Sequence, residues 1–209
     1  MWKLIAALLA LFKRVPVVSR EVASRDTQAP LPVTRETQSG DDPALPLASQ
    51  MIRAFEGCAR ILSDGRIVPY LDAKRVPTIG WGNTQWEDGT PVTIADPAIT
   101  SARAEALFLY HLRAFMHGVR AEIPEAREHE AAAFCCFAYN VGLGGFRTSS
   151  ALRFYKAGAI NAAADALELW NKAGPQVVKG LQRRRRAEAL VLKGTDWPQA
   201  KRLADLAFP

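Results

Sequence analysis

The pattern of hydrophobic and polar positions divides the chain into an apolar N-terminus, a polar stretch and a long region with helical periodicity. Apolar residues run without interruption from Leu4 to Phe12, whereas residues 24–46 are rich in Pro, Thr, Gln, Ser and Asp and lack apolar periodicity. Such a polar stretch can bury too little apolar surface to compensate for the conformational entropy that is lost on folding. It is therefore predicted to be a flexible linker. We therefore expect a leader at 1–23, a linker at 24–46 and one folded domain at 47–209.

The folded domain is predicted to be mostly helical, with one small sheet. Apolar side chains recur at three- and four-residue spacing over 47–55, which predicts a helix that ends near Gly57. A Ser-Asp-Gly turn at 63–65 precedes two short β-rich runs at 66–72 and 78–82. Helices around a small antiparallel sheet form an α+β domain. The remaining periodicity predicts helices at 100–121, 126–139, 148–156, 160–171 and 177–192.

Two carboxylates are the candidate catalytic groups. Glu56 lies in the last turn of the first predicted helix, where the negative end of the helix dipole and partial burial both disfavour an ionised carboxylate. Asp72 follows a strand that would fold back toward that helix end, and the hydroxyl of Thr78 can hold a water by donating and accepting hydrogen bonds. A protonated and an ionised carboxyl on either side of a sugar bond suit glycoside hydrolysis. From spacing alone, ordinary surface roles for these common residue types remain open.

A series of short motifs surrounds these residues and continues along the chain. They are Glu56-Gly57, Pro69-Tyr70-Leu71-Asp72, Thr78-Ile79-Gly80-Trp81-Gly82-Asn83-Thr84, Phe137-Ala138-Tyr139-Asn140-Val141-Gly142, Trp170, Gly180-Leu181, Arg184-Arg185 and Glu188. Together these motifs resemble the phage-type lysozymes, or endolysins, of glycoside hydrolase family 24. The resemblance covers about residues 48–194 in the family's order and implies a lysozyme-like α+β fold.

The resemblance implies roles for several of the matching residues. Glu56 would protonate the oxygen between N-acetylmuramic acid and N-acetylglucosamine, while Asp72 and Thr78 would position and activate water on the opposite face, with inversion. Gly80 and Gly82 would allow close backbone approach. For Trp81, stacking on sugar and packing in the core are both open. The residues implied to line the cleft or support the fold are Tyr70, Gly80, Trp81, Gly82, Asn140, Trp170 and Arg184.

Three departures from the family pattern bear on the site. Fifteen residues separate Glu56 from Asp72, so the first hairpin is enlarged. Arg75 stands where the family usually has a turn glycine, which would adopt a positive φ at little cost. Asn83 replaces a frequent histidine. The catalytic set is retained, but we expect the turn after Asp72 to differ in shape.

Neither a metal nor a cofactor is expected. His129-Glu130 begins like a zinc-protease helix, but Ala133 stands where the second histidine is needed. Three cysteines are too few for a disulfide framework, and Cys135-Cys136 lies in an apolar run, so buried thiols are predicted there. Cys58, close to Glu56, is interpreted as an inert thiol rather than a regulatory one. Acid–base hydrolysis needs only side chains and water.

The net charge of +6 favours an anionic polymer or surface as partner. The run Arg183–Arg186 would suit nucleic-acid phosphates, but the apolar residues Leu181, Leu190 and Val191 frame it as one amphipathic helix. We expect most of these arginines on solvated or salt-bridged faces, in a structural or wall-facing role. No nucleic-acid motif accompanies them, so no nucleic-acid partner is expected.

The leading functional hypothesis is an endolysin that hydrolyses the β-1,4 bond of peptidoglycan and lyses the host cell for phage release. One alternative is a bacterial muramidase used as a toxin or in wall remodelling, and another is a wall- or membrane-binding protein that does not catalyse. Peptidoglycan is the expected partner, and the enzyme is expected to be a monomer.

The leader is expected to associate transiently with the inner membrane through residues 2–14. Leu4–Phe12 is far shorter than the roughly 20 residues that span a bilayer. Lys13 and Arg14 disfavour easy export. A weak signal-anchor is therefore the hypothesis and a frayed amphipathic tail the alternative. The protein is expected in the host cytoplasm or at the inner membrane, and to act in the periplasm.

Overall fold

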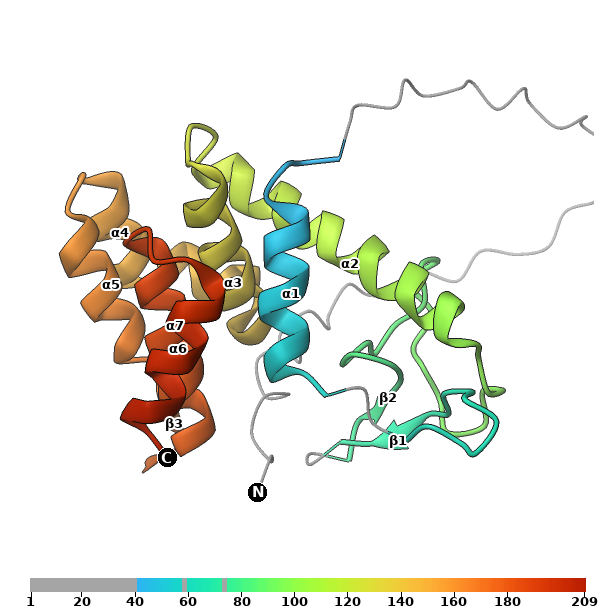
Figure 1. The fold of residues 1–209 in the computed structure, drawn as a ribbon. Coiled ribbons are helices and arrows are strands. Elements are labelled where there is room, and N and C mark those ends of the chain that lie inside the picture. Colours follow the sequence, from blue (N-terminus) through green and yellow to red (C-terminus); the bar gives the residue numbers. More distant parts are fainter. Residues whose placement is uncertain (1–40, 58–59, 73–74) are drawn as a thin grey trace, which may run out of the picture.

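The computed structural model describes residues 41–57, 60–72 and 75–209, so the predicted leader, most of the predicted linker and Cys58 lie outside the described residues. The described chain is an α+β fold, as predicted, dominated by helices (Figure 1). Its helices are α1 (Leu45–Phe55), α2 (Ser101–Glu122), α3 (Glu128–Thr148), α4 (Ser150–Lys156), α5 (Ile160–Glu168), α6 (Lys179–Leu192) and α7 (Trp197–Ala207). Its strands form two antiparallel hairpins, β1 (Tyr70–Leu71) with β2 (Pro77–Thr78) and β3 (Lys172–Ala173) with β4 (Gln176–Val177).

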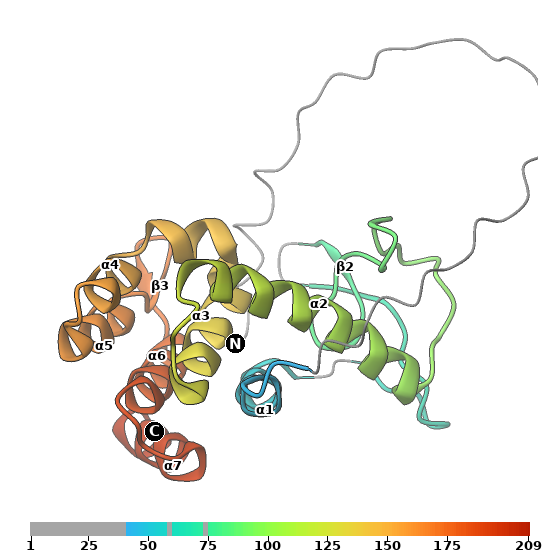
Figure 2. The ribbon, with the colours of Figure 1, turned by 90° about the horizontal axis from the view of Figure 1, so that it is seen from above.

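Two regions of unequal size share the long helix α2. The helical region contains α1 and α3–α7, and the β region is residues 60–100 (Figures 1 and 2). α2 crosses from one to the other: its C-terminal half, including Met116 and Val119, joins the large helical core. Its N-terminal half supplies Ala104 and Leu107 to a small second core. That small core is completed by Ile67, Ile79 and Val92.

The folded region starts earlier than the predicted boundary at residue 47. Ala44 is fully buried, and α1 begins at Leu45 with a proline in its first turn, where a missing N–H costs nothing. Asp41 and Asp42 form ion pairs with Arg113 and Arg120 of α2. The last six residues of the predicted linker therefore belong to the fold, because paired charges and one buried alanine compensate for their polar composition.

Several element boundaries differ from the sequence prediction. The helix predicted at 126–139 continues to Thr148 as α3, with a kink at Gly142, whose φ of 81° is left-handed. The strand predicted at 66–72 is reduced to β1, with Ile67 forming only isolated bridges. Helix α7 and the β3–β4 hairpin were not predicted, although Asp196 caps α7 and a proline follows, both ordinary start signals.

Two further features of the helical region bear on the predictions. Cys135 and Cys136 are free and fully buried in α3, as predicted. Within the described part of the chain, no helix has the length and hydropathy needed to cross a bilayer.

Candidate active site

Glu56 lies immediately beyond the C-terminal end of α1. Its backbone has left the helical conformation (φ −95°, ψ 101°), while its N–H still donates to the carbonyl of Ile52 at 2.8 Å. The side chain is only 13% exposed, and its Oε1 accepts a hydrogen bond from Nη1 of Arg184 at 2.5 Å. The predicted position at a helix end is therefore correct, but the carboxylate also has a buried basic partner from α6.

Arg184 joins three elements at one point. Its guanidinium is 1% exposed and reaches Glu56 after α1, the backbone carbonyl of Cys136 in α3 at 2.9 Å, and Glu188 one turn along α6 at 3.1 Å. Arg184 was predicted to support the fold or the cleft. The structure shows direct contact with the candidate acid, so Arg184 orients the Glu56 carboxylate.

Arg185 is fully buried beside this group. It forms an ion pair with Oε2 of Glu188 at 2.8 Å and donates to Oδ1 of Asn140, and its guanidinium lies 4.8 Å from the ring centroid of Phe137. We expected most arginines of the run on solvated or salt-bridged faces, and Arg184, Arg185 and Arg186 do form salt bridges. Arg184 and Arg185 are nevertheless buried and not solvated, whereas Arg186 pairs with Glu168 at 2.8 Å in a partly exposed position.

These buried charges compensate one another. Arg184 and Arg185 contribute two positive charges, and Glu56 and Glu188 contribute two negative charges when ionised. Burial lowers the pKa of Arg185 to about 10, although Glu188 opposes this shift. Burial also opposes ionisation of Arg184, but the neighbouring Cys136 thiol and Glu56 and Glu188 carboxylates raise its pKa above the usual value. Pairing is what makes such burial tolerable.

Asp72 and Thr78 lie on opposite sides of the first hairpin. β1 and β2 pair with Tyr70 opposite Thr78, and the backbones of Asp72 and Val76 close the turn at 3.0 Å. Oδ1 of Asp72 accepts the N–H of Val76 at 2.7 Å, which orients the carboxylate. Thr78 is buried and donates its hydroxyl proton to the carbonyl of Val76 at 3.0 Å. This bond uses the hydroxyl proton and leaves the oxygen lone pairs of Thr78 able to accept another hydrogen bond.

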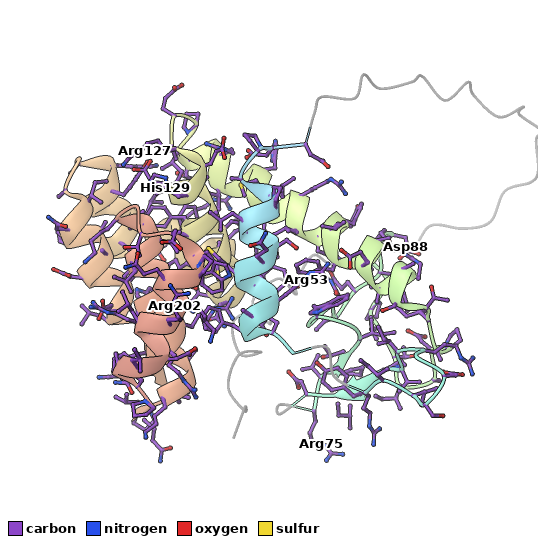
Figure 3. All side chains as sticks on the ribbon, viewed as in Figure 1. Arg53, Arg75, Asp88, Arg127, His129 and Arg202 are labelled. Carbon is purple, nitrogen blue, oxygen red and sulfur yellow. The ribbon has the colours of Figure 1, made fainter. Side chains whose placement is uncertain are left out.

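In the turn after Asp72, Arg75 has a backbone conformation that a glycine would favour. Arg75 has a φ of 63°, in the left-handed region, and its N–H donates to the carbonyl of Asp72 at 2.9 Å. Arg75 itself thus adopts the left-handed conformation that a glycine would take at this position, although it is unfavourable for a residue with a Cβ. The side chain is exposed at the edge of the β region (Figure 3).

The glycines of the segment after Thr78 are explained by backbone conformation. Gly80 and Gly82 have φ values of 59° and 93°, inside a turn closed by hydrogen bonds between Ile79 and Asn83 of 2.8 and 3.0 Å. A Cβ at Gly80 would meet Ala104 at 3.5 Å, an ordinary contact. Within the protein, positive φ rather than the predicted close approach accounts for these glycines.

Tyr139 of α3 brings the β region close to the end of α1. Its hydroxyl donates to the backbone carbonyl of Trp81 at 2.9 Å. Burial raises the pKa of Tyr139, and the nearby Glu56 and Tyr70 raise it further, so both lie within electrostatic reach of this one side chain. Figure 1 likewise shows the β1–β2 hairpin beside the lower end of α1. The fold thus gathers Glu56, Tyr70 and the segment around Trp81.

The supporting residues take different roles. Trp170 packs edge-on against Phe137 of α3, with ring centroids 5.3 Å apart, and so supports the helical core. Asn140 accepts a hydrogen bond from Arg185 and belongs to the buried charge group. From the sequence, Arg185 received only the general structural or wall-facing role of its run, and Glu188 received no individual role. Glu188 nevertheless follows Arg184 and Arg185 by four and three residues, the spacing of helical ion pairs.

Comparison with known proteins gives one consistent family. The family model of phage lysozymes matches residues 53–188, more than half of the chain. An endolysin of Bacillus phage PZA is 35% identical over 147 residues, which cover 69% of this chain and 53% of that protein. A SAR-endolysin of Bacteriophage PS119 is 36% identical over 127 residues, covering 59% of this chain and 71% of that protein. The chain thus spans about half the length of the PZA relative.

A solved structure has the same fold. The endolysin from Escherichia coli O157:H7 phage FAHEc1 superimposes with a TM-score of 0.65 at 27% sequence identity. The match covers 76% of this chain and 98% of that structure. It therefore extends over nearly all of that protein and includes both the helical region and the β region.

Proposed function

The chain belongs to the phage lysozyme family, whose members are glycoside hydrolases, and we propose that Glu56, Asp72 and Thr78 catalyse its reaction. The proposed substrate is the β-1,4 bond between N-acetylmuramic acid and N-acetylglucosamine in peptidoglycan. The proposed biological outcome is lysis of the host cell and release of phage, as the endolysin relatives suggest.

In the proposed reaction, Glu56 gives its carboxyl proton to the glycosidic oxygen as the bond from that oxygen to C1 breaks. A water attacks C1 from the opposite face. One hydrogen of that water is held by Oγ1 of Thr78, whose own proton is already donated to Val76. Asp72 takes the other proton, so the sugar leaves with inverted configuration.

The observation that carries this proposal is that each group is held by a separate, defined set of hydrogen bonds. Glu56 is fixed by the buried Arg184, and Asp72 is fixed by the backbone N–H of Val76. Such fixed orientation lets the reacting groups meet the substrate without an entropy cost at the moment of reaction.

The testing experiment replaces Glu56 by glutamine, an amide of the same shape that donates no proton from a carboxyl. Peptidoglycan clearing should fall by at least the roughly 10²–10⁴-fold typical of a lost general acid. The matched control is Glu125→Gln, an exposed glutamate between α2 and α3, which should keep wild-type activity. Near-normal clearing by folded Glu56→Gln protein would contradict the assignment.

We also propose that residues 2–14 associate transiently with the inner membrane before the enzyme acts on the wall in the periplasm. This proposal is supported by the apolar run Leu4–Phe12 and by the similarity to a SAR-endolysin. Cells that express the chain without a holin should contain it in the membrane fraction, and deletion of 2–14 should abolish this and delay lysis. Wholly cytosolic wild-type protein that lyses cells only when a holin is supplied would reject the anchor.

A further inference from the structure

Arg53, in the last turn of α1, fills the junction between three parts of the molecule. Its guanidinium carbon lies 4.2 Å from the ring centroid of Trp81 and 4.7 Å from that of Phe108 in α2. Its Nε donates to Oγ of Ser49 at 3.2 Å, and it forms an ion pair with Glu105 of α2. Figure 3 shows Arg53 on the side of α1 that faces α2 and the β region.

Trp81 is the corresponding anchor of the β region. Its ring stacks with the Arg53 guanidinium and lies 5.7 Å from the ring of Phe108. Its backbone carbonyl accepts the hydroxyl of Tyr139 from α3. One residue of the β region is thus held by α1, α2 and α3 together, and a face of the indole is covered by Arg53. This packing favours the core role over the sugar-stacking role that the sequence left open for Trp81.

The stack is linked to both halves of the site by short, ordered stretches of chain. Arg53 precedes Glu56 by three residues, within one helical turn. Trp81 follows Thr78 by three residues, within the turn that hydrogen bonds between Ile79 and Asn83 close. A displacement of the Arg53–Trp81 contact would therefore move Glu56 relative to the hairpin that carries Asp72 and Thr78.

We propose that Arg53 is a positioning residue, and that its stack on Trp81 sets the placement of Glu56 relative to Asp72 and Thr78. This inference rests on the proposed roles of those three residues. A planar guanidinium suits the position, because it stacks on an aromatic ring and pairs with a carboxylate at the same time. Misplacing catalytic groups by about 1 Å can cost on the order of 10²-fold in rate.

The test compares Arg53→Met with a matched variant, Arg103→Met. Arg103, in the first turn of α2 and two residues before Glu105, also lies over a tryptophan of the β region, 5.6 Å from the ring centroid of Trp86, and also pairs with a glutamate, Glu87.

Arg53→Met removes cation–π contacts with Trp81 and Phe108, one ion pair and the hydrogen bond to Ser49. Arg103→Met removes one cation–π contact and one ion pair. Both variants keep an unbranched side chain. Turnover number, KM on soluble peptidoglycan fragments, the pH profile of turnover and the melting temperature are measured for both.

Arg53→Met is expected to lower kcat by roughly 10-fold or more with KM within about twofold of wild type, and with an unchanged shape of the pH profile. Arg103→Met should keep wild-type kcat while its melting temperature falls, because its contacts also join α2 to the β region but lie away from the proposed catalytic residues. Equal kcat for the two variants at matched folded fraction, or an effect confined to KM, would overturn the proposal. A shifted pH profile would also overturn it, because it would show that Arg53 acts through charge.

Milder variants cover the case in which Arg53→Met does not fold. Arg53→Lys keeps a cation over the ring but loses the planar stack, and Trp81→Phe keeps a smaller ring. Each should lower kcat less than Arg53→Met does, and wild-type kcat in both folded variants would overturn the proposal.

Glu56→Gln is assayed alongside these variants to separate the two proposals. If Glu56→Gln stays active, the proposed function fails; if it is inactive and the Arg53 variants match Arg103→Met, only the positioning inference fails.

Discussion

The helical region and the β region hold their catalytic groups by different kinds of interaction. Glu56 depends on a buried arginine that also contacts α3 and is paired within α6, in the middle of a large apolar core. Asp72 and Thr78 depend on the hydrogen bonds of one tight turn in the β region. The small core of that region includes two residues from α2. The acid is therefore placed by tertiary structure, and its partners are placed by local backbone hydrogen bonds.

The comparison teaches that the two halves of the site should respond to mutation in different ways. Loss of a charge in the buried group leaves another charge in the core without compensation, which threatens the whole fold. Loss of a side chain in the hairpin leaves most backbone hydrogen bonds in place, so chemistry should suffer more than stability.

The largest effect on stability is expected for Glu188→Gln. This fully buried carboxylate pairs with both Arg184 and Arg185. Its neutralisation leaves two buried guanidinium groups with only Glu56, at a cost of about 3–5 kcal/mol in the free energy of unfolding. Urea denaturation measures this cost. The control is Glu168→Gln, which breaks the partly exposed pair with Arg186 and should cost less than about 1 kcal/mol.

The hairpin should show the opposite behaviour. Asp72→Asn keeps an oxygen that can accept the N–H of Val76 but loses the charge that draws a proton from water. We expect kcat to fall by about 10²-fold or more with the melting temperature nearly unchanged. Thr78→Ala should have a severe to moderate effect, and Thr78→Ser should keep more activity because the hydroxyl remains. A large stability loss in Asp72→Asn with kcat intact would contradict the contrast.

The pH dependence of stability should reveal a second buried carboxylate in the helical region. Burial would raise the pKa of Glu130, but hydrogen bonds from Arg127 and Tyr155 hold it below the ordinary value of 4.5. Because the folded state favours the ionised form, this stabilisation is present above pH 4.5 and is lost as the pH falls through the lower folded value. Glu130→Gln should cost about 1–2 kcal/mol at pH 7. Its deficit in melting temperature should shrink at acid pH; a deficit independent of pH would contradict this account.

The smallest effect is expected in the β region, and it is a gain. Arg75→Gly removes the strain of a left-handed backbone at a residue with a Cβ and should raise the free energy of unfolding by up to about 1 kcal/mol. Arg66→Gly is the control, because Arg66 is exposed in the same region without a positive φ and pairs with Asp64. Thermal unfolding should show a higher midpoint for the first variant and a lower one for the second.

Local signals predicted most of the helices, whereas the family resemblance, and not spacing, singled out the candidate residues. The helix end near Glu56 and the short β-rich runs on either side of the turn after Asp72 followed from periodicity and turn residues, which act over a few positions. The environment of Glu56 did not follow, because Arg184 lies 128 positions away and no local pattern shows which buried charge it meets. Burial of Arg184 and Arg185 was missed for the same reason: charged residues are rarely buried unless paired, and the pairing is tertiary.

The central claim is that Glu56 acts on one face of the sugar and that Asp72 and Thr78 act on the other. Its most direct test is the configuration of the sugar at the moment of release. Fresh product from soluble peptidoglycan fragments can be followed by proton NMR before the anomers equilibrate. Water held by Asp72 and Thr78 opposite Glu56 predicts that the first product is the inverted, α anomer. Appearance of the retained β anomer first would contradict the account, because it would require a covalent intermediate formed on a carboxylate in place of a bound water.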